Sequence, residues 1–160
     1  MITVGKSYFG KGLFATSNIA AGTVLIKIKG TKLKFRQTTI LGNKESYPLQ
    51  IETDEYILCD PFTFCNHSCV PNCGINADLE FYALRKIKKG EELAWDYSTS
   101  MLERHWEMRC KCGSVSCRKI IKDFDKLPQK IQYRYLNMEI VLPYIVRFLK
   151  EATLPLAHTG

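Results

Sequence analysis

The sequence predicts a single, mostly β domain that ends in a helical segment. Its 160 residues, of which 46% are hydrophobic, are enough for one domain with a buried core. Over the first 30 residues, glycines separate short apolar runs, a pattern typical of short strands joined by tight turns. After Leu127 the apolar residues recur at helical spacing instead, so helices are expected only at the C-terminal end.

Short β-like stretches follow one another through the first hundred residues. Each contains β-branched or aromatic residues and is bounded by glycine or by charged turn residues. The stretches 47–51 and 56–59 are close enough to pair around the polar turn between them. The predicted strands are 13–15, 24–26, 47–51, 56–59, 81–84 and one that runs through Trp95 from a turn at 87–93.

A basic segment extends over 27–36. Cations alternate there with apolar residues, which predicts a β-hairpin that turns near Gly30 and Thr31 and carries its cations on one face. One interpretation is a solvated sheet face. The other is a docking surface for an acidic partner such as nucleic acid, which the net charge of +7 favours.

The C-terminal segment predicts a helix that starts at Pro128, a residue suited to a first helical position. Pro143 should kink or divide this helix. Packing against the core is the expected role of its apolar stripe, and binding of a partner is the alternative. The residues of the stripe are Ile131, Tyr135, Met138 and Leu142, continued by Tyr144, Ile145, Phe148 and Leu149.

The composition also bears on cellular location. No apolar run approaches the ~20 residues needed to cross a bilayer, so no membrane partner is expected. Residues 1–6 lack the basic start and apolar stretch of a secretory signal. We therefore expect an intracellular protein, with cytoplasm and nucleus not distinguished. In a reducing compartment its seven cysteines are better explained as metal ligands, buried thiols or catalysts than as disulfides.

A cysteine cluster in the segment 110–117 predicts a zinc site. Cys110, Cys112 and Cys117 have the spacing C-x-C-x4-C, and Gly113 lets the backbone turn between them. Structural zinc usually takes four ligands in a tetrahedron, and thiolates are good ligands. The alternative, three reduced surface thiols, would be prone to oxidation. The candidates for the fourth ligand are Cys69, Cys73, Cys65, Cys59, His67 and His105.

The remaining cysteines have other interpretations. Isolated cysteines such as Cys59 and Cys73 are commonly small buried apolar residues, and so is Cys65. A catalytic cysteine would need a histidine activator, together with a cation or a helix N-terminus that lowers its pKa. Cys65 and Cys69 lie close to His67 in sequence, but this spacing does not establish the required geometry.

Four motifs occur in a fixed order along the chain. They are 10–15 (GKGLFA), 66–72 (NHSCVPN), 90–97 (GEELAWDY) and the cysteine segment 110–117. Together they resemble the SET-domain protein-lysine methyltransferases that carry a post-SET zinc segment. The resemblance covers residues 5–121, and the compact layout is similar to the small stand-alone SET proteins of bacteria.

The resemblance implies a β-clip SET fold of small curved sheets with a pseudoknot-like crossing. Such threading is rare among folds, and periodicity alone does not suggest it. In this fold the segment that holds Asn66 and His67 passes beside the segment that holds Tyr97. The implied parts are a SET domain at 1–100, a post-SET zinc-binding segment at 101–122 and a C-terminal helical extension at 123–160.

The implied activity is transfer of a methyl group from S-adenosyl-L-methionine to a lysine side chain of a protein, with a histone or histone-like protein among the substrates. The methyl donor would bind in a surface cleft, and the lysine would enter from the opposite face. Cys69 is the implied fourth ligand of Zn²⁺, which would fasten the later loop onto the cofactor-binding segment. An apolar residue such as Ile120 or Ile121 would cover the adenine. The residues implied to contact the cofactor are Lys11, Gly12, Leu13, Phe14, Asn66, His67 and Tyr97.

The resemblance implies catalytic roles for Tyr97, whose hydroxyl would orient the reacting groups, and for Tyr47, which would line the lysine channel. Structural tyrosines are the alternative. The amine must be neutral although free lysine has a pKa of ~10.4. Burial near a sulfonium favours the neutral form, so no general base is required. Asp96 and Glu92 are expected to be structural hydrogen-bonding residues. By the resemblance, Trp95 and Ile75 fall near positions that set how many methyl groups are added. Neither has a hydroxyl, which favours di- or trimethylation, and the alternative is that the bulky Trp95 restricts the channel.

Two alternatives use the same residues differently. One is a catalytically inactive, zinc-stabilised SET-like module that binds chromatin, nucleic acid or a protein. The other is a free-standing zinc domain for nucleic acid, although the cysteine spacing matches no finger or ribbon. For the enzyme, the net charge of +7 would repel a lysine-rich substrate unless the channel mouth is acidic, and Glu52, Asp54 and Glu55 could supply that charge.

Overall fold

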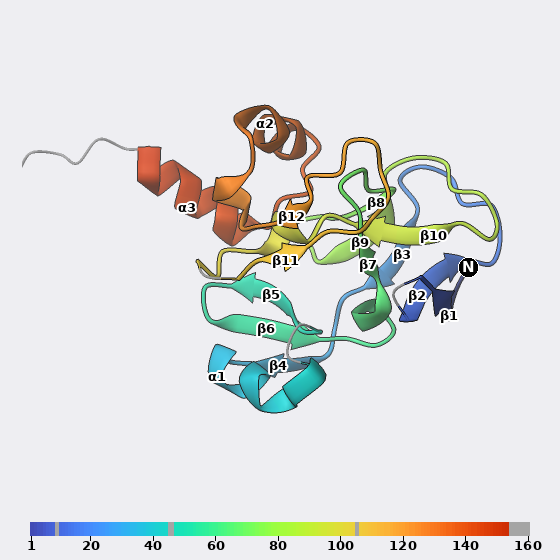
Figure 1. Ribbon diagram of the computed structural model, residues 1–160, viewed down its shortest axis with the longest axis horizontal. Helices are drawn as coiled ribbons and strands as arrows, with labels where there is room; N and C mark the ends of the chain where they lie inside the picture. Colours follow the sequence, from blue (N-terminus) through green and yellow to red (C-terminus); the bar gives the residue numbers. More distant parts are fainter. Residues whose placement is uncertain (9, 45–46, 105, 154–160) are drawn as a thin grey trace, which may run out of the picture.

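The computed structural model describes residues 1–8, 10–44, 47–104 and 106–153. Its described part is mostly β, with small sheets and two C-terminal helices, as predicted (Figure 1). The strands are β1 (Ile2–Ser7), β2 (Gly10–Ala15), β3 (Val24–Lys27), β4 (Thr31–Leu33), β5 (Leu49–Glu52), β6 (Glu55–Leu58), β7 (Asn66–His67), β8 (Cys73–Ile75), β9 (Glu80–Ala83), β10 (Glu92–Trp95), β11 (Met108–Arg109) and β12 (Ile120–Ile121).

Helical elements connect and cover these strands. Within the described residues, no helix is long and apolar enough to span a membrane. The α-helices are α1 (Phe35–Thr38), α2 (Gln129–Asn137) and α3 (Pro143–Thr153). The short 3-10 turns are η1 (Thr39–Lys44), η2 (Phe62–Phe64), η3 (Tyr97–Ser100) and η4 (Phe124–Lys126).

The strands of the described chain form separate small sheets, with the orders β1-β2-β10-β7, β3-β9-β8, β4-β6-β5 and β11-β12. In Figure 1, α1 lies with the β4-β6-β5 sheet at the lower edge, whereas α2 and α3 lie on the upper side. The predicted pairing of the stretches 47–51 and 56–59 is confirmed by the antiparallel pair of β5 and β6.

The parallel pair of β7 and β10 positions the site. Asn66 lies opposite Ala94, and His67 lies opposite Trp95. Because parallel strands cannot be joined by a tight turn, the chain leaves after β7, forms β8 and β9, and returns to enter β10. The segment of Asn66 and His67 therefore lies directly beside the segment that leads into Tyr97, as the resemblance implied.

The predicted basic hairpin is wrong. Strand β3 pairs with β9, whereas β4 pairs with β6, so the two halves of the segment 27–36 belong to different sheets. Ile28 between them is buried, and a Cβ on Gly30 would collide with the carbonyl of Leu58. The chain thus passes tightly from one sheet to the next. Alternation of residue types cannot distinguish one hairpin from two strands with separate partners.

The C-terminal helices pack on the same core as the strands. Pro128 is the residue before α2, and α3 begins at Pro143, so the predicted division at a proline is confirmed. Tyr135 and Leu142 lie in one buried cluster with strand residues such as Leu13. Core packing is therefore confirmed for most of the stripe. Met138, just past the end of α2, is instead 37% exposed.

Candidate active site and metal centre

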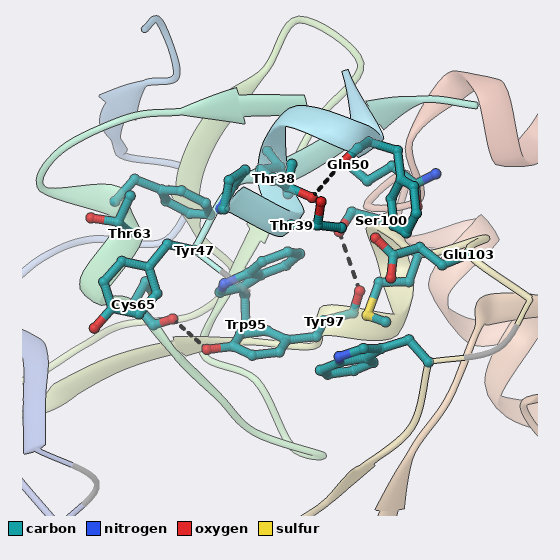
Figure 2. Close-up of a pocket in the computed structure, with 16 residues that line it drawn as sticks. Thr38, Thr39, Tyr47, Gln50, Thr63, Cys65, Trp95, Tyr97, Ser100 and Glu103 are labelled. Carbon is teal, nitrogen blue, oxygen red and sulfur yellow. Dashed lines mark hydrogen bonds between the residues drawn. The ribbon is translucent and has the colours of Figure 1, made fainter. Parts of the chain in front are cut away.

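Two cavities of the described structure meet at a pair of tyrosines. The smaller has a volume of about 250 Å³, and aromatic side chains such as Trp95 and Trp106 contribute to its wall (Figure 2). The larger, of about 820 Å³, lies between the start of β2, the segment around β7 and the later cysteine loop. Tyr47, Thr63 and Tyr97 line both cavities. Ligands bound in the two cavities would therefore approach each other at these side chains.

Tyr97 is held rigidly at this junction. Its hydroxyl donates to the carbonyl of Cys65 over 2.9 Å (Figure 2), and its backbone N–H donates to Nδ1 of His67 over 3.2 Å. Burial raises the pKa of Tyr97, so the phenol keeps its proton at neutral pH. Burial likewise lowers the pKa of His67 to about 4, so its ring is neutral. The site thus presents a neutral, fixed hydroxyl group.

Tyr47 approaches the junction from another segment. It is 37% exposed, and its ring meets that of Phe64 edge-on at a centroid distance of 6.2 Å. Figure 2 shows Tyr47 and Tyr97 on either side of Cys65. The structure therefore brings together both tyrosines that the sequence singled out.

The residues predicted to contact a cofactor divide into two groups. Lys11, Asn66, His67 and Tyr97 line the larger cavity, whereas Gly12, Leu13 and Phe14 do not. The side chain of Leu13 is fully buried in the core. Any contact from these three would use their backbone, and that role stays a prediction.

The absence of a side chain at Gly12 has a structural explanation that is independent of any cofactor. A Cβ at Gly12 would collide with Oε1 of Glu92. Oε1 also accepts a hydrogen bond from Nδ2 of Asn66 at 2.7 Å, and Oε2 accepts one from Oγ of Ser7 at 3.0 Å. Nδ2 of Asn66 lies 3.0 Å from the carbonyl of Lys11 as well. The absent side chain therefore leaves room for a carboxylate that accepts hydrogen bonds from Ser7 of β1 and Asn66 of β7.

Four cysteines converge as the sequence analysis proposed. The Sγ atoms of Cys69, Cys110, Cys112 and Cys117 all lie within 4.8 Å of one another, and those of Cys69 and Cys110 are 3.7 Å apart. A tetrahedral zinc with Zn–S bonds of ~2.3 Å has S···S edges of ~3.8 Å. The described donor set therefore fits zinc. Among the other candidate ligands, His105 lies outside the described residues.

Backbone and ring N–H groups surround these sulfur atoms. The N–H of Arg118 donates to Sγ of Cys69, and that of Lys119 donates to Sγ of Cys117, each over 3.4 Å. Nε2 of His67 lies 3.3 Å from Sγ of Cys69. Such outer hydrogen bonds orient metal ligands. His67 is therefore placed to support a ligand rather than to serve as one.

The cysteine loop forms one wall of the larger cavity. Arg109, Cys110 and Cys112 line it together with Ile121, which is fully buried. Ile120 is 40% exposed and does not line this cavity. Of the two isoleucines considered as covers for a ligand, Ile121 is the one the structure places at the wall.

A catalytic-cysteine interpretation receives no support from the geometry. Burial raises the pKa of Cys65 well above its usual range, and its thiol faces the carbonyl of Leu93 at 3.4 Å. Burial also raises the pKa of Cys73 to about 12. Both side chains are therefore protonated thiols at neutral pH, whereas a nucleophile would need to be a thiolate.

Many of the exposed charges that drew attention in the sequence are locally paired. Lys27 contacts Glu80 at 3.1 Å, and Lys34 contacts Glu55 at 3.5 Å. Glu52 pairs with Arg147. Pairing of this kind lowers the net charge that the basic segment offers to an acidic partner. Docking of nucleic acid on this segment stays a prediction.

Sequence reasoning missed the carboxylate that lines the smaller cavity. Glu103 lies in its wall and accepts a hydrogen bond from the hydroxyl of Tyr56 at 2.8 Å. Glu52, Asp54 and Glu55, the residues that could supply an acidic channel mouth, are not among the lining residues. A single glutamate in a loop carries no local signal of this kind, because only the fold brings it to the cavity.

Comparison with known proteins agrees with this geometry. Residues 10–98 match the family described as SET domain. Over 131 residues, the chain is 35% identical to a histone-lysine N-methyltransferase, H3 lysine-4 specific, of Aspergillus oryzae, covering 67% of this chain and 10% of that protein. It is 28% identical to histone-lysine N-methyltransferase 2B of Homo sapiens over 129 residues, covering 70% of this chain and 5% of that protein. The chain thus spans a tenth or less of the length of these relatives.

A solved structure shows the same fold. The crystal structure of KRYPTONITE in complex with mCHG DNA and SAH aligns with a TM-score of 0.59 at 24% sequence identity, covering 76% of this chain and 29% of that chain. The family match includes the β2, β7 and β10 segments that build the two cavities. This chain belongs to the SET domain family.

Proposed function

We propose that this protein is a protein-lysine methyltransferase that uses S-adenosylmethionine. The observation that carries the proposal is the meeting of two cavities at Tyr97 and Tyr47. Membership of the SET domain family supports it. The names of both relatives specify histone lysine, and that of the Aspergillus oryzae protein specifies H3 lysine 4. A histone or histone-like protein is therefore the substrate class that we infer, and a nuclear site of action would follow from it.

The larger cavity is assigned to the methyl donor. Its volume of about 820 Å³ is in the range of pockets that hold ligands of this size. Lys11 offers a cation for the donor's carboxylate, and Ile121 offers an apolar surface for its adenine. When bound, S-adenosylmethionine supplies an activated methyl group on a positively charged sulfur. Asn66 and His67 would hold the donor's polar groups.

The smaller cavity is assigned to the target lysine. Its wall includes the aromatic side chains of Trp95 and Tyr47. Removal of the amine from water and the nearby sulfonium of the donor would favour the reactive neutral form. Because Tyr97 donates its proton to the carbonyl of Cys65, its oxygen retains lone pairs that can accept an amine N–H. Tyr97 therefore orients the nucleophile and is not a base.

The metal centre is assigned a supporting role. A four-cysteine donor set is typical of structural zinc, whose ligands come entirely from the protein. The ion would join Cys69, beside β7, to the loop that carries the other three ligands. This connection would keep the loop wall of the larger cavity in place. The C-terminal helices and the zinc segment would both act as parts of the SET unit.

The decisive experiment measures transfer of labelled methyl groups to histone H3 and to a library of lysine peptides. Tyr97→Phe should lower kcat at least about tenfold, because one orienting hydrogen bond is lost. Tyr144→Phe is the control, since its buried hydroxyl also donates to a carbonyl, that of Ser100, but does not line either cavity. In calorimetry with S-adenosylmethionine, absence of donor binding would indicate a binding module without enzyme activity. Donor binding without transfer to any lysine, or full activity of Tyr97→Phe, would overturn the proposal.

A further inference from the structure

The carboxylate of Asp96, the residue directly before Tyr97, is completely buried. Nη1 of Arg118 lies 2.6 Å from its Oδ2, and Nη2 donates to Oδ1 over 2.8 Å. The hydroxyl of Tyr135 donates to Oδ2 over 2.8 Å, and the N–H of Ser98 donates to Oδ1 over 3.1 Å. One side chain thus joins the catalytic segment to two other parts of the chain.

The two side-chain partners come from elements that sequence reasoning kept apart. Arg118 follows the zinc ligand Cys117 directly, and its side chain is only 10% exposed. Tyr135 belongs to α2 and is fully buried. A buried carboxylate is tolerated only with such partners, and removal of one leaves its charge poorly compensated. Asp96 therefore depends on the zinc loop and on α2 simultaneously.

The carboxylate of Asp96 also lies beside His67, which lines the larger cavity. Its Oδ1 lies 3.5 Å from Nδ1 of His67. That nitrogen accepts the backbone N–H of Tyr97, so the other ring nitrogen carries the proton and faces Sγ of Cys69 at 3.3 Å. A shift of Asp96 would displace Tyr97 through the shared backbone, and it would displace His67 because the imidazole ring contacts the Asp96 carboxylate.

Tyr135 also contacts the backbone of Cys69, one of the four cysteines of the metal centre. Its hydroxyl oxygen lies 3.4 Å from the carbonyl of Cys69 and 2.8 Å from the carboxylate of Asp96. A single hydroxyl on α2 thus connects the backbone of a zinc ligand with the residue that precedes Tyr97. Among the described residues, no other side chain of α2 donates a hydrogen bond to either of these groups.

We propose that Asp96 is a positioning residue for Tyr97 and His67, and that Tyr135 on α2 and Arg118 on the zinc loop are the two anchors that hold it. This inference rests on the proposed function. It makes α2 a working part of the catalytic site, because the position of the orienting hydroxyl depends on a bond from that helix. It also links order in the zinc loop to the geometry of methyl transfer.

The test compares Tyr135→Phe with Tyr144→Phe. Both remove one buried hydroxyl from the C-terminal helical segment, and both hydroxyls bond to the segment 96–100, Tyr144 through the carbonyl of Ser100 at 2.7 Å. Tyr135→Phe should lose somewhat more thermal stability, because its hydroxyl donates to a carboxylate and that of Tyr144 to a neutral carbonyl. Only Tyr135→Phe should lower kcat and weaken S-adenosylmethionine binding, each by about fivefold, the loss expected for one hydrogen bond. Tyr144→Phe should keep both values within about twofold of the wild-type protein.

A second readout does not need activity. Zinc release to a chelator should be about fivefold faster in Tyr135→Phe than in Tyr144→Phe, because the carbonyl segment of Cys69 loses a bond. If Tyr135→Phe does not fold, Arg118→Lys serves as the second test. Lysine keeps the charge but cannot reach both carboxylate oxygens, so this variant should show the same lower kcat and weaker donor binding. Equal kinetics and equal zinc release in the two tyrosine variants would overturn this inference. Inactivity of the wild-type protein would instead overturn the proposed function.

Discussion

Replacing Gly12 by alanine tests how the cavity wall is built. The added Cβ would lie 3.0 Å from Cβ of Ser7 and 3.1 Å from Cδ of Glu92, and it would collide with Oε1 of Glu92. The carboxylate would have to move, and its hydrogen bonds from Ser7 and Asn66 would be lost or lengthened. We therefore expect a protein that folds but has lower stability and a displaced Asn66 side chain at the cavity.

The size of the effect follows from those two bonds. Each hydrogen bond to a charged acceptor contributes ~1.5–3 kcal/mol, and alanine recovers ~0.5–1 kcal/mol of backbone entropy relative to glycine. Allowing for partial relaxation, the free energy of unfolding should fall by about 3 kcal/mol. In a chain of this size, that loss corresponds to a decrease in Tm of roughly 6–12 °C. Urea unfolding and a thermal melt measure the two quantities.

Gly5→Ala is the matched control, because Gly5 lies directly opposite Gly12 in the β1–β2 pair. A Cβ there would lie 2.9 Å from the ring of Phe14, a side chain that can rotate, and would not touch Glu92. We expect a smaller loss, about 1 kcal/mol, and unchanged binding of S-adenosylmethionine. If Gly12→Ala were as stable as Gly5→Ala, the account of Glu92 as the link between Ser7 of β1 and Asn66 of β7 would be wrong.

Two further predictions concern the metal and pH. Purified protein should contain one zinc ion per chain, which metal analysis measures. Chelation should disorder the loop at 108–121 and weaken S-adenosylmethionine binding at least about tenfold, because metal binding and loop folding are coupled. Calorimetry measures this affinity, and an unchanged value in the metal-free protein would contradict the assignment. Arg85 holds the pKa of Glu91 at about 2 through a side-chain hydrogen bond, below the ordinary value of 4.5. Between these pH values the unfolded chain binds more protons, so the stability from Glu91 is complete above pH 4.5 and is lost as the pH falls towards 2. Glu91→Gln should therefore reduce the slope of unfolding free energy against pH in this window, and an identical slope in the variant would refute the pairing.

Several strands and three of the four clustered cysteines were accessible from the sequence because their signals are local. Alternation over four or five residues marks a strand, and C-x-C-x4-C places three thiolates within one short loop. The proline rule located the break between α2 and α3 at Pro143 for the same reason. The motifs around Asn66 and Tyr97 led to the family by resemblance.

Other features depended on long-range contacts. The segment 27–36 was expected to fold back on itself, but alternation reports which side chains share a face and not which strand lies alongside. Glu103 reaches the smaller cavity only because residues from α1, β5 and η3 surround the same space. Gly12 was expected to approach a cofactor, and the structure adds a contact with Glu92, 80 residues further along the chain.

The sequence by itself indicated several of the strands, the C-terminal helices and the loop in which three of the thiolates gather, because spacing along the chain is enough to reveal those properties; Cys69 and the two tyrosines came from the resemblance to the family. Only the tertiary structure decided that Asp96 is buried between Arg118 and Tyr135. A carboxylate needs its partners at hydrogen-bonding distance, and these lie 22 and 39 residues away in sequence. Their meeting is fixed by packing of the whole chain, which no local pattern encodes.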